Sequence, residues 1–408
     1  MEKQLRKNVL FNTAGSLLFY ICQAAINLLV VALAGMDANG MLGVAMTAAN
    51  VCVSFASYGM RTFQVSDLAH KYTDRTYLWS RQLTVAAAWL GALAFAFINS
   101  YSAQQRWVIV LFTGYRLVES WSDVWHGYLQ RAERIDLVGV SFGVRGILTA
   151  GIIALGLLIT HDLVLTVGVL FALNAVYVLA VDLPLAKKRA DLAQTGGGSV
   201  WALLLECLPL AVYAALNTSI ASTPRYYCER LLGETQLGYF TSVFLPVLIL
   251  QVAVVYLFVP FITLFAKLWA NKDKTSYFKG VKVLFICLAA VWAAGAGGVA
   301  LLGKWGLGFL YPTTPEILQF APLLQPLVIC CVVTVLATVL CNLLTIAREM
   351  RGLICGCALG LVVALAASPA LITAFGVWGA AWATLAGIGA QSLALLLFLL
   401  HRCKKQFG

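Results

Sequence analysis

Charged residues are scarce in this sequence. Only 11% of the 408 residues are Asp, Glu, Lys or Arg, whereas about 25% of a typical soluble domain is charged. Hydrophobic residues make up 61% of the chain, and its mean hydropathy is +0.88. A soluble fold of this length could not bury so much apolar surface behind so thin a polar exterior. The composition therefore excludes a soluble enzyme, a nucleic-acid-binding protein and a secreted disulfide scaffold. It predicts an all-α protein with many membrane-spanning helices.

Sequence motifs for metal binding, nucleotide binding and hydrolysis are also lacking. The 11 cysteines form no C-x-x-C pair, and the 4 histidines, His126 among them, have no second ligand at metal-binding spacing. No Walker motif, Gly-rich nucleotide loop or G-x-S-x-G elbow is present. We therefore expect no metal site, no cofactor and no ATP-driven transport by this chain alone. We interpret the cysteines as small membrane-buried hydrophobes and each histidine as a residue of the membrane interface.

Twelve stretches of about 20 mostly apolar residues are long enough to cross a bilayer. The first follows a basic N-terminal segment and is too long for the hydrophobic part of a signal peptide, so we interpret it as a membrane helix. The fourth contains Arg116, Glu119 and Asp123, which makes it the weakest of the set. The predicted spans are residues 9–33, 40–60, 82–100, 106–125, 138–159, 163–183, 201–222, 237–262, 281–302, 319–345, 353–373 and 376–400.

The distribution of basic residues predicts the orientation. Of the 28 Lys and Arg residues, 22, including Arg81, fall in segments on the same side as the two termini, and 4 fall on the opposite side. The remaining 2, Arg116 and Arg145, lie within spans. Because cytoplasmic loops are enriched in Lys and Arg, this bias predicts that both termini lie in the cytoplasm. We therefore expect a multi-pass protein of the cytoplasmic membrane, with the lipid bilayer and not nucleic acid as its surroundings.

The longest polar stretch lies in the middle of the chain. Residues 184–200 include three consecutive basic residues and three consecutive glycines, a composition typical of a flexible linker. The stretch falls between the sixth and seventh spans. It therefore divides the chain into an N-terminal six-helix lobe, residues 1–183, and a C-terminal six-helix lobe, residues 201–408. Two bundles joined in this way form a common transporter plan, with a substrate path between the halves.

Five short motifs carry a resemblance to a known family. They are Lys7–Ser16 (KNVLFNTAGS), Tyr58–Asp67 (YGMRTFQVSD), Asp123–Arg131 (DVWHGYLQR), Pro224–Tyr227 (PRYY) with Leu237–Phe240 (LGYF), and Trp378–Ala381 (WGAA). In this order they resemble the Wzx-type polysaccharide flippases of the multidrug/oligosaccharidyl-lipid/polysaccharide exporter (MOP) superfamily. The resemblance is carried mainly by residues 7–240, and the C-terminal half is similar chiefly in its helix layout.

The resemblance implies a two-lobed bundle of twelve helices around a central cavity. It also implies that the protein moves an undecaprenyl-diphosphate-linked oligosaccharide from the cytoplasmic to the outer leaflet by alternating access. No covalent chemistry on the substrate is expected. Such a step belongs to the biosynthesis of capsule, exopolysaccharide or another surface polysaccharide. The implied partners are the lipid-linked oligosaccharide itself, the glycosyltransferases of the pathway and a glycan polymerase.

Charged side chains inside the predicted spans are candidates for the substrate path, because a charge in hydrocarbon is costly. Arg116, Glu119 and Asp123 are spaced i, i+3 and i+7, which places them on one face of the fourth span. Arg116 lies roughly 15 Å from the outer end of its span, at 1.5 Å per residue, and Arg145 lies at a similar depth in the fifth. Two interpretations are open: an ion-pair network that joins helices, or a cavity cluster that meets the diphosphate or the sugar.

Three further residues extend this set. Arg61, at the inner end of the second span, is either a topology charge or a group that gathers the lipid head group at the cytoplasmic mouth. Glu206 is either a hydrogen-bonded residue near the inner interface or a protonatable coupling group, and Asp123 is the other candidate for ion coupling. Asp182, beside the cytoplasmic end of the sixth span, is interpreted as a solvated helix terminus.

Two other functions compete with that of a flippase. A small-molecule antiporter of the multidrug-extrusion type would share the architecture, but organic cations favour an acidic cavity, and Arg116 and Arg145 argue against it. A membrane glycan polymerase would need a large external loop with catalytic groups, whereas the predicted external connections are short. We therefore predict a transporter and not an enzyme.

Overall fold

The computed structural model describes residues 2–67, 71–189 and 198–407. Residues 1, 68–70, 190–197 and 408 lie outside this description. Only the backbone is described for residues 2–7, 9, 62, 66, 189, 252, 253, 255–260, 262 and 263. The structure is 92% helical, and the described residues contain no strand. The prediction of an all-α, polytopic membrane protein is confirmed.

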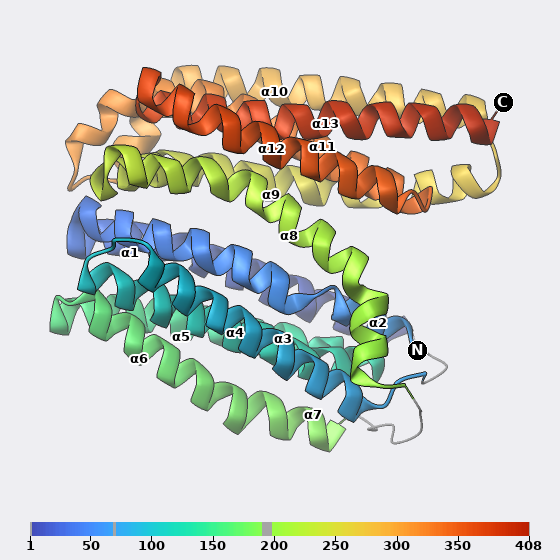
Figure 1. Ribbon diagram of the computed structural model, residues 1–408, viewed down its shortest axis with the longest axis horizontal. Coiled ribbons are helices and arrows are strands. Elements are labelled where there is room, and N and C mark those ends of the chain that lie inside the picture. Colours follow the sequence, from blue (N-terminus) through green and yellow to red (C-terminus); the bar gives the residue numbers. More distant parts are fainter. Residues whose placement is uncertain (1, 68–70, 190–197, 408) are drawn as a thin grey trace. The chain divides into compact units, whose positions relative to one another are not determined.

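The chain divides into two compact units, Met1–Ala215 and Leu216–Gly408 (Figure 1). Unit 1 contains α1 (Glu2–Ser57), α2 (Met60–Ser66), α3 (Asp74–Ile98), α4 (Ala103–Arg131), α5 (Ile135–Thr160), α6 (Leu163–Tyr177), the π-helical segment η1 (Val178–Asp182), α7 (Leu183–Arg189) and the first half of α8 (Val200–Leu232). Unit 2 contains the rest of α8, α9 (Glu234–Ala270), α10 (Lys274–Leu310), the 3-10 segment η2 (Pro315–Leu323), α11 (Leu324–Ile346), α12 (Met350–Phe375) and α13 (Val377–Phe407).

Each of the twelve predicted spans is mainly helical in the structure. The sixth continues from α6 through η1, the tenth runs from η2 into α11, and the second, third and twelfth extend one to three residues past the end of a helix. Nine helices in the described part of the chain are long and apolar enough to cross a membrane. One of them, α1, carries the first two spans, which meet at Gly35, where φ is 86° and ψ is −178°. Only glycine adopts such a conformation readily, so it separates the two spans without a loop. The charged α4 and the long α9 complete the set of twelve. The orientation of the termini stays a prediction.

Helices α1 and α5 touch through their backbones. A Cβ atom added to Gly139 would lie 2.3 Å from the carbonyl oxygen of Phe11, and one added to Gly15 would lie 1.8 Å from the carbonyl oxygen of Gly139. Small residues allow this close approach between membrane helices. The contact holds α5, the helix that carries Arg145, firmly against α1.

The starts of the helices around α4 are set by side-chain caps. The Ser102 hydroxyl accepts a hydrogen bond of 3.1 Å from the backbone N–H of Gln105 at the start of α4. Thr73 caps α3 and Asp162 caps α6 in the same manner. Such caps satisfy backbone donors that a first helical turn leaves unpaired. The caps therefore fix the residue at which α3, α4 and α6 each begin, and with it the position of every polar side chain along the helix.

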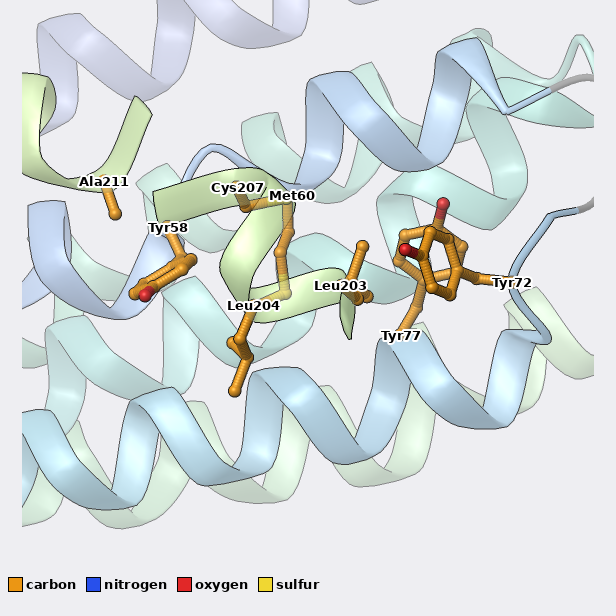
Figure 2. Packing of buried hydrophobic residues seen from close by; sticks show 8 residues of the cluster. All are labelled: Tyr58, Met60, Tyr72, Tyr77, Leu203, Leu204, Cys207 and Ala211. Carbon is orange, nitrogen blue, oxygen red and sulfur yellow. The ribbon is translucent and has the colours of Figure 1, made fainter. Parts of the chain in front are cut away.

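Helix α8 contributes to both units. Its first half packs in unit 1, where Leu203 and Cys207 gather with Tyr58, Met60 and Tyr77 (Figure 2). None of these five residues is more than 8% exposed. This apolar cluster explains why the division between the units falls within α8, after residue 215.

The predicted linker occupies residues 184–200. Its first part is helical, because Leu183–Arg189 forms α7, and residues 190–197 lie outside the described residues. The boundary between the two compact units lies elsewhere, between residues 215 and 216. The lobes 1–183 and 201–408, and the central cavity between them, stay predictions.

Candidate functional site

Charged side chains within the helices of unit 1 gather around α4. Arg116, Glu119 and Asp123 follow one another at the predicted spacing, and His126 continues the same stripe. Their charged partners come from α2, α3, α5 and η1. We call this set the polar network. Its members are Arg61, Arg81, Arg116, Glu119, Asp123, His126, Arg145 and Asp182.

Glu119 is the central acid of the first half of the network. Its carboxylate pairs with Arg116 on the same helix. It also accepts a 2.9 Å hydrogen bond from the Tyr115 hydroxyl and lies 3.7 Å from Nη2 of Arg145. The Glu119 side chain is 11% exposed, whereas that of Arg116 is 23% exposed. The predicted pair within α4 is therefore present, and part of the Arg116 guanidinium remains accessible.

Arg145 joins α5 to two neighbouring segments. Its Nη1 donates a 2.7 Å hydrogen bond to Oγ of Ser122 and lies 3.6 Å from Oδ2 of Asp182, while Nη2 faces Glu119. The side chain is only 2% exposed. A buried cation is tolerated when acids and hydrogen bonds surround it. For Arg145, the geometry favours the interpretation as part of an ion-pair network.

The interpretation of Asp182 as a solvated helix terminus is wrong. Its side chain is 1% exposed and accepts a 2.6 Å hydrogen bond from Oγ of Ser141. Nε2 of His126 lies 3.5 Å from Oδ2 of the same carboxylate. His126 is also 1% exposed, so its interpretation as an interface residue is wrong as well. Both are buried because η1 packs against α4 and turns its last residue toward that helix.

Asp123 is the acid of the second half of the network. Arg61 of α2 donates a 2.6 Å hydrogen bond from Nη1 to Asp123, and its Nε and Nη2 reach Oε1 of Gln130 at 3.2 Å and 3.1 Å. Arg81 lies 3.6 Å from the other carboxylate oxygen of Asp123 and donates to the Ala56 carbonyl at 2.8 Å. Arg81, one of the 22 basic residues predicted on the side of the termini, lies within α3 and is fully buried.

The polar network carries more positive than negative charge. The network contains four arginines and three carboxylates, so its net charge is one positive unit when His126 is neutral. Three members are appreciably open: Arg61 at 28%, Arg116 at 23% and Asp123 at 22% side-chain exposure. Each exposed guanidinium offers a planar fork of N–H donors to an anion. The network can therefore bind an anionic group through its two open arginines.

Glu206 lies outside the polar network. It pairs with Lys71, which precedes α3, and the two side chains are 36% and 58% exposed. The hydrogen bond to Glu206 raises the pKa of Lys71 above its usual value. A raised pKa keeps the lysine charged to more alkaline pH, so the pair persists throughout the physiological range. This is the geometry of a partly exposed surface pair, and ion coupling by Glu206 stays a prediction.

Two further residues of the site could be found from the α4 stripe. Extending it beyond Asp123 by three and seven residues gives His126 and Gln130, which face Asp182 and Arg61 respectively. The helical period of 3.6 residues is the signal that indicates them. Arg81 and Asp182 belong to other helices, and no sequence spacing links either to α4.

No family model and no curated protein matches this chain. A multidrug resistance MATE family transporter of the MOP superfamily, in an inward-facing conformation, is 10% identical with a TM-score of 0.71, covering 98% of each chain. The lipid II flippase MurJ, in an inward closed conformation, is also 10% identical with a TM-score of 0.71, covering 98% of this chain and 90% of its own.

A third solved structure is a MOP superfamily transporter from Pyrococcus furiosus described as having a binding pocket of reverse polarity. It is 10% identical with a TM-score of 0.62, covering 99% of this chain and 95% of its own. At these identities the likeness concerns the fold. The chain is therefore built like the membrane transporters and flippases of the MOP superfamily.

Proposed function

We propose that this chain is a Wzx-type flippase that moves an undecaprenyl-diphosphate-linked oligosaccharide from the cytoplasmic to the outer leaflet by alternating access. The observation that carries the proposal is the pair of partly exposed guanidinium groups, Arg61 and Arg116, within a network that holds four arginines and three carboxylates. The fold supports it, since the lipid II flippase MurJ matches with a TM-score of 0.71.

The polar network suits a diphosphate because each of two acids contacts two arginines, one accessible and one buried. The buried arginine can still pair with the acid when the accessible arginine leaves it. Asp123 contacts the accessible Arg61 and the buried Arg81, and Glu119 contacts the accessible Arg116 and the buried Arg145. When a diphosphate binds the accessible arginine, the displaced carboxylate keeps the buried one. Neither acid is then left as an unpaired charge, which would be costly in a low-dielectric interior.

The side chains of the network have different roles in this proposal. Arg61 and Arg116 bind the phosphates bidentately, as the guanidinium fork allows. Glu119 and Asp123 hold these arginines and release them to the substrate, and Arg145 is a positioning residue for Glu119. Asp123 is the most exposed acid of the network, so it is the first candidate for ion coupling, and Glu206 is the second.

The proposed reaction fits between two classes of enzyme. Glycosyltransferases on the cytoplasmic side assemble the lipid-linked oligosaccharide, and a glycan polymerase or ligase on the outer side consumes it. The flippase itself resides in the cytoplasmic membrane with both termini in the cytoplasm. Its product contributes to capsule, exopolysaccharide or another surface polysaccharide.

A multidrug-type antiporter is the second candidate, because a MATE transporter matches with the same TM-score of 0.71. An organic cation would have to bind Asp123 or Glu119. Two arginines already lie near each of these acids. The surplus positive charge repels a cationic substrate, so the network favours the flippase.

The proposal is tested in a deletion strain that carries the Arg61→Ala/Arg116→Ala double variant. We expect lipid-linked oligosaccharide to accumulate in the cytoplasmic leaflet while membrane abundance stays normal, because Asp123 and Glu119 keep their buried arginines. The matched control is Arg402→Ala, which breaks a partly exposed ion pair in unit 2.

The control variant should deliver the oligosaccharide normally. Normal delivery by the double variant, in a strain with no redundant transporter, would contradict the proposal. Drug sensitivity in the deletion strain, without accumulation of the lipid-linked oligosaccharide, would favour the antiporter.

A further inference from the structure

Unit 2 contains an open groove at one end of its helices. The groove has a volume of about 750 Å³, which is within the range of roughly 300–1,000 Å³ typical of small-molecule sites. It forms where α8 ends, α9 begins, η2 lies and α12 turns into α13. The eight residues that line it are all uncharged. Four of them have side chains that can hydrogen-bond to a ligand or stack on it: Gln236, Gln319, Phe320 and Trp378.

Two glycine turns shape the rim of the groove. Gly233 joins α8 to α9 with φ of 89°, and Gly376 joins α12 to α13 with φ of 57°. Residues with a Cβ atom rarely adopt these angles, so glycine allows each pair of helices to meet without a long loop. In η2, the Phe320 ring stacks on Tyr239, with centroids 4.8 Å apart and planes 28° apart. The turns and the stacked ring hold the lining residues in place.

The lining chemistry matches a saccharide. The side chains of Gln236 and Gln319 make no hydrogen bond to another residue of the described part of the chain, so each side-chain amide has two donors and an acceptor available for hydroxyl groups. The faces of Trp378 and Phe320 are electron-rich, and the C–H groups on one face of a pyranose ring pack favourably against such a surface. The lining has no cationic group to pair with a diphosphate and no carboxylate to pair with an organic cation.

We propose that this groove binds the glycan of the transported lipid-linked oligosaccharide. The inference rests on the proposed function and adds a sugar subsite to it, separate from the arginines of the polar network. The predicted orientation places this end of unit 2 outside the cytoplasm, because α8 is the seventh span and ends there. The groove therefore receives the sugar on the side where the oligosaccharide is delivered.

Two saccharides of the producing cell carry the hydroxyl groups and pyranose faces that this groove would recognise. One is the repeat unit that the lipid carries, and the other is the finished polysaccharide at the cell surface. The groove has the volume of a site for a small molecule and not of a long channel. We therefore assign it to the repeat unit, and the experiment includes both.

Saturation-transfer NMR on the full chain in nanodiscs tests the assignment. The probes are the soluble repeat unit, released by mild acid from the lipid-linked oligosaccharide of the producing cell, and the purified surface polysaccharide. The variants are Trp378→Ala and the Gln236→Ala/Gln319→Ala pair. The matched control is Trp305→Ala, which removes a tryptophan of α10 that is 69% exposed and lies outside the groove.

We expect the repeat unit to bind the wild type and the control equally, and to bind either groove variant about tenfold more weakly. Gln319 is exposed, so the glutamine pair reports on binding even if Trp378→Ala disturbs the turn. Equal binding of the repeat unit to wild type and the glutamine pair would overturn the assignment. Binding of the finished polysaccharide alone would overturn it as well.

The outcome separates this inference from the proposed function. If the groove does not bind the glycan, flipping through Arg61 and Arg116 is unaffected and the proposed function stands. If the wild type does not deliver lipid-linked oligosaccharide in cells, the proposed function fails, whatever the groove binds.

Discussion

Replacing Arg145 by methionine tests whether this buried arginine holds the helices of unit 1 together. Methionine keeps an unbranched apolar side chain but removes the charge. The substitution removes the 2.7 Å hydrogen bond to Ser122 and the longer contacts of 3.6 Å to Asp182 and 3.7 Å to Glu119. A hydrogen bond from a charged group contributes about 1.5–3 kcal/mol, and leaving a buried charge alone costs about 3–5 kcal/mol.

Neither acid is left entirely alone in this variant. Asp182 keeps Ser141 and His126, and Glu119 keeps Arg116 and Tyr115. We therefore expect the free energy of unfolding to fall by about 2–4 kcal/mol, below the full penalty. For a unit of this size, 1 kcal/mol corresponds to about 2–4 °C in the unfolding midpoint, so the midpoint should fall by roughly 4–16 °C.

The assay is thermal unfolding of the purified protein in nanodiscs, measured beside export in cells. The double variant Arg145→Met/Asp182→Asn should recover part of the lost stability, because the carboxylate that faces the removed cation is neutral. A coupling of about 0.5–3 kcal/mol is usual for residues in contact. A single variant with the wild-type midpoint but no export would refute the reasoning and move Arg145 into the substrate path.

Three further outcomes are expected. Arg61→Lys should retain more export than Arg61→Ala but less than the wild type, because lysine keeps the charge and loses the fork; equal export by both would exclude bidentate binding. Gly139→Leu should destabilise the protein by about 3 kcal/mol, the upper end of the usual cost of overpacking, since its side chain would meet the α1 backbone, whereas Gly151→Ala, with open space around it, should be tolerated. In a cysteine-free background, a membrane-impermeant thiol reagent should label Glu316→Cys from outside and should not label Lys274→Cys; the reverse pattern would contradict the predicted orientation.

The helices and much of the α4 face could be predicted from the sequence alone. Low charge and long apolar runs require membrane helices, because backbone groups in hydrocarbon must be hydrogen-bonded within the segment. The i, i+3, i+7 spacing likewise placed Arg116, Glu119 and Asp123 on one face, since the helical period is the same in every context. The break after the first span was also predictable, although the structure reduces it to the single residue Gly35.

Only the tertiary structure decided which charges meet and which are buried. Arg61 and Asp123 lie 62 positions apart in the sequence, and Ser141 and Asp182 lie 41 apart, yet each pair is joined by a hydrogen bond of 2.6 Å. Such contacts depend on the axial register and rotation of neighbouring helices, which arise from side-chain packing across the bundle. For the same reason, the sequence indicated a solvated helix terminus for Asp182 and an interface residue for His126, whereas the two are buried partners in the structure. Local composition indicates that a helix crosses the membrane, whereas the neighbouring helices determine whether a charge near its end faces water or an arginine.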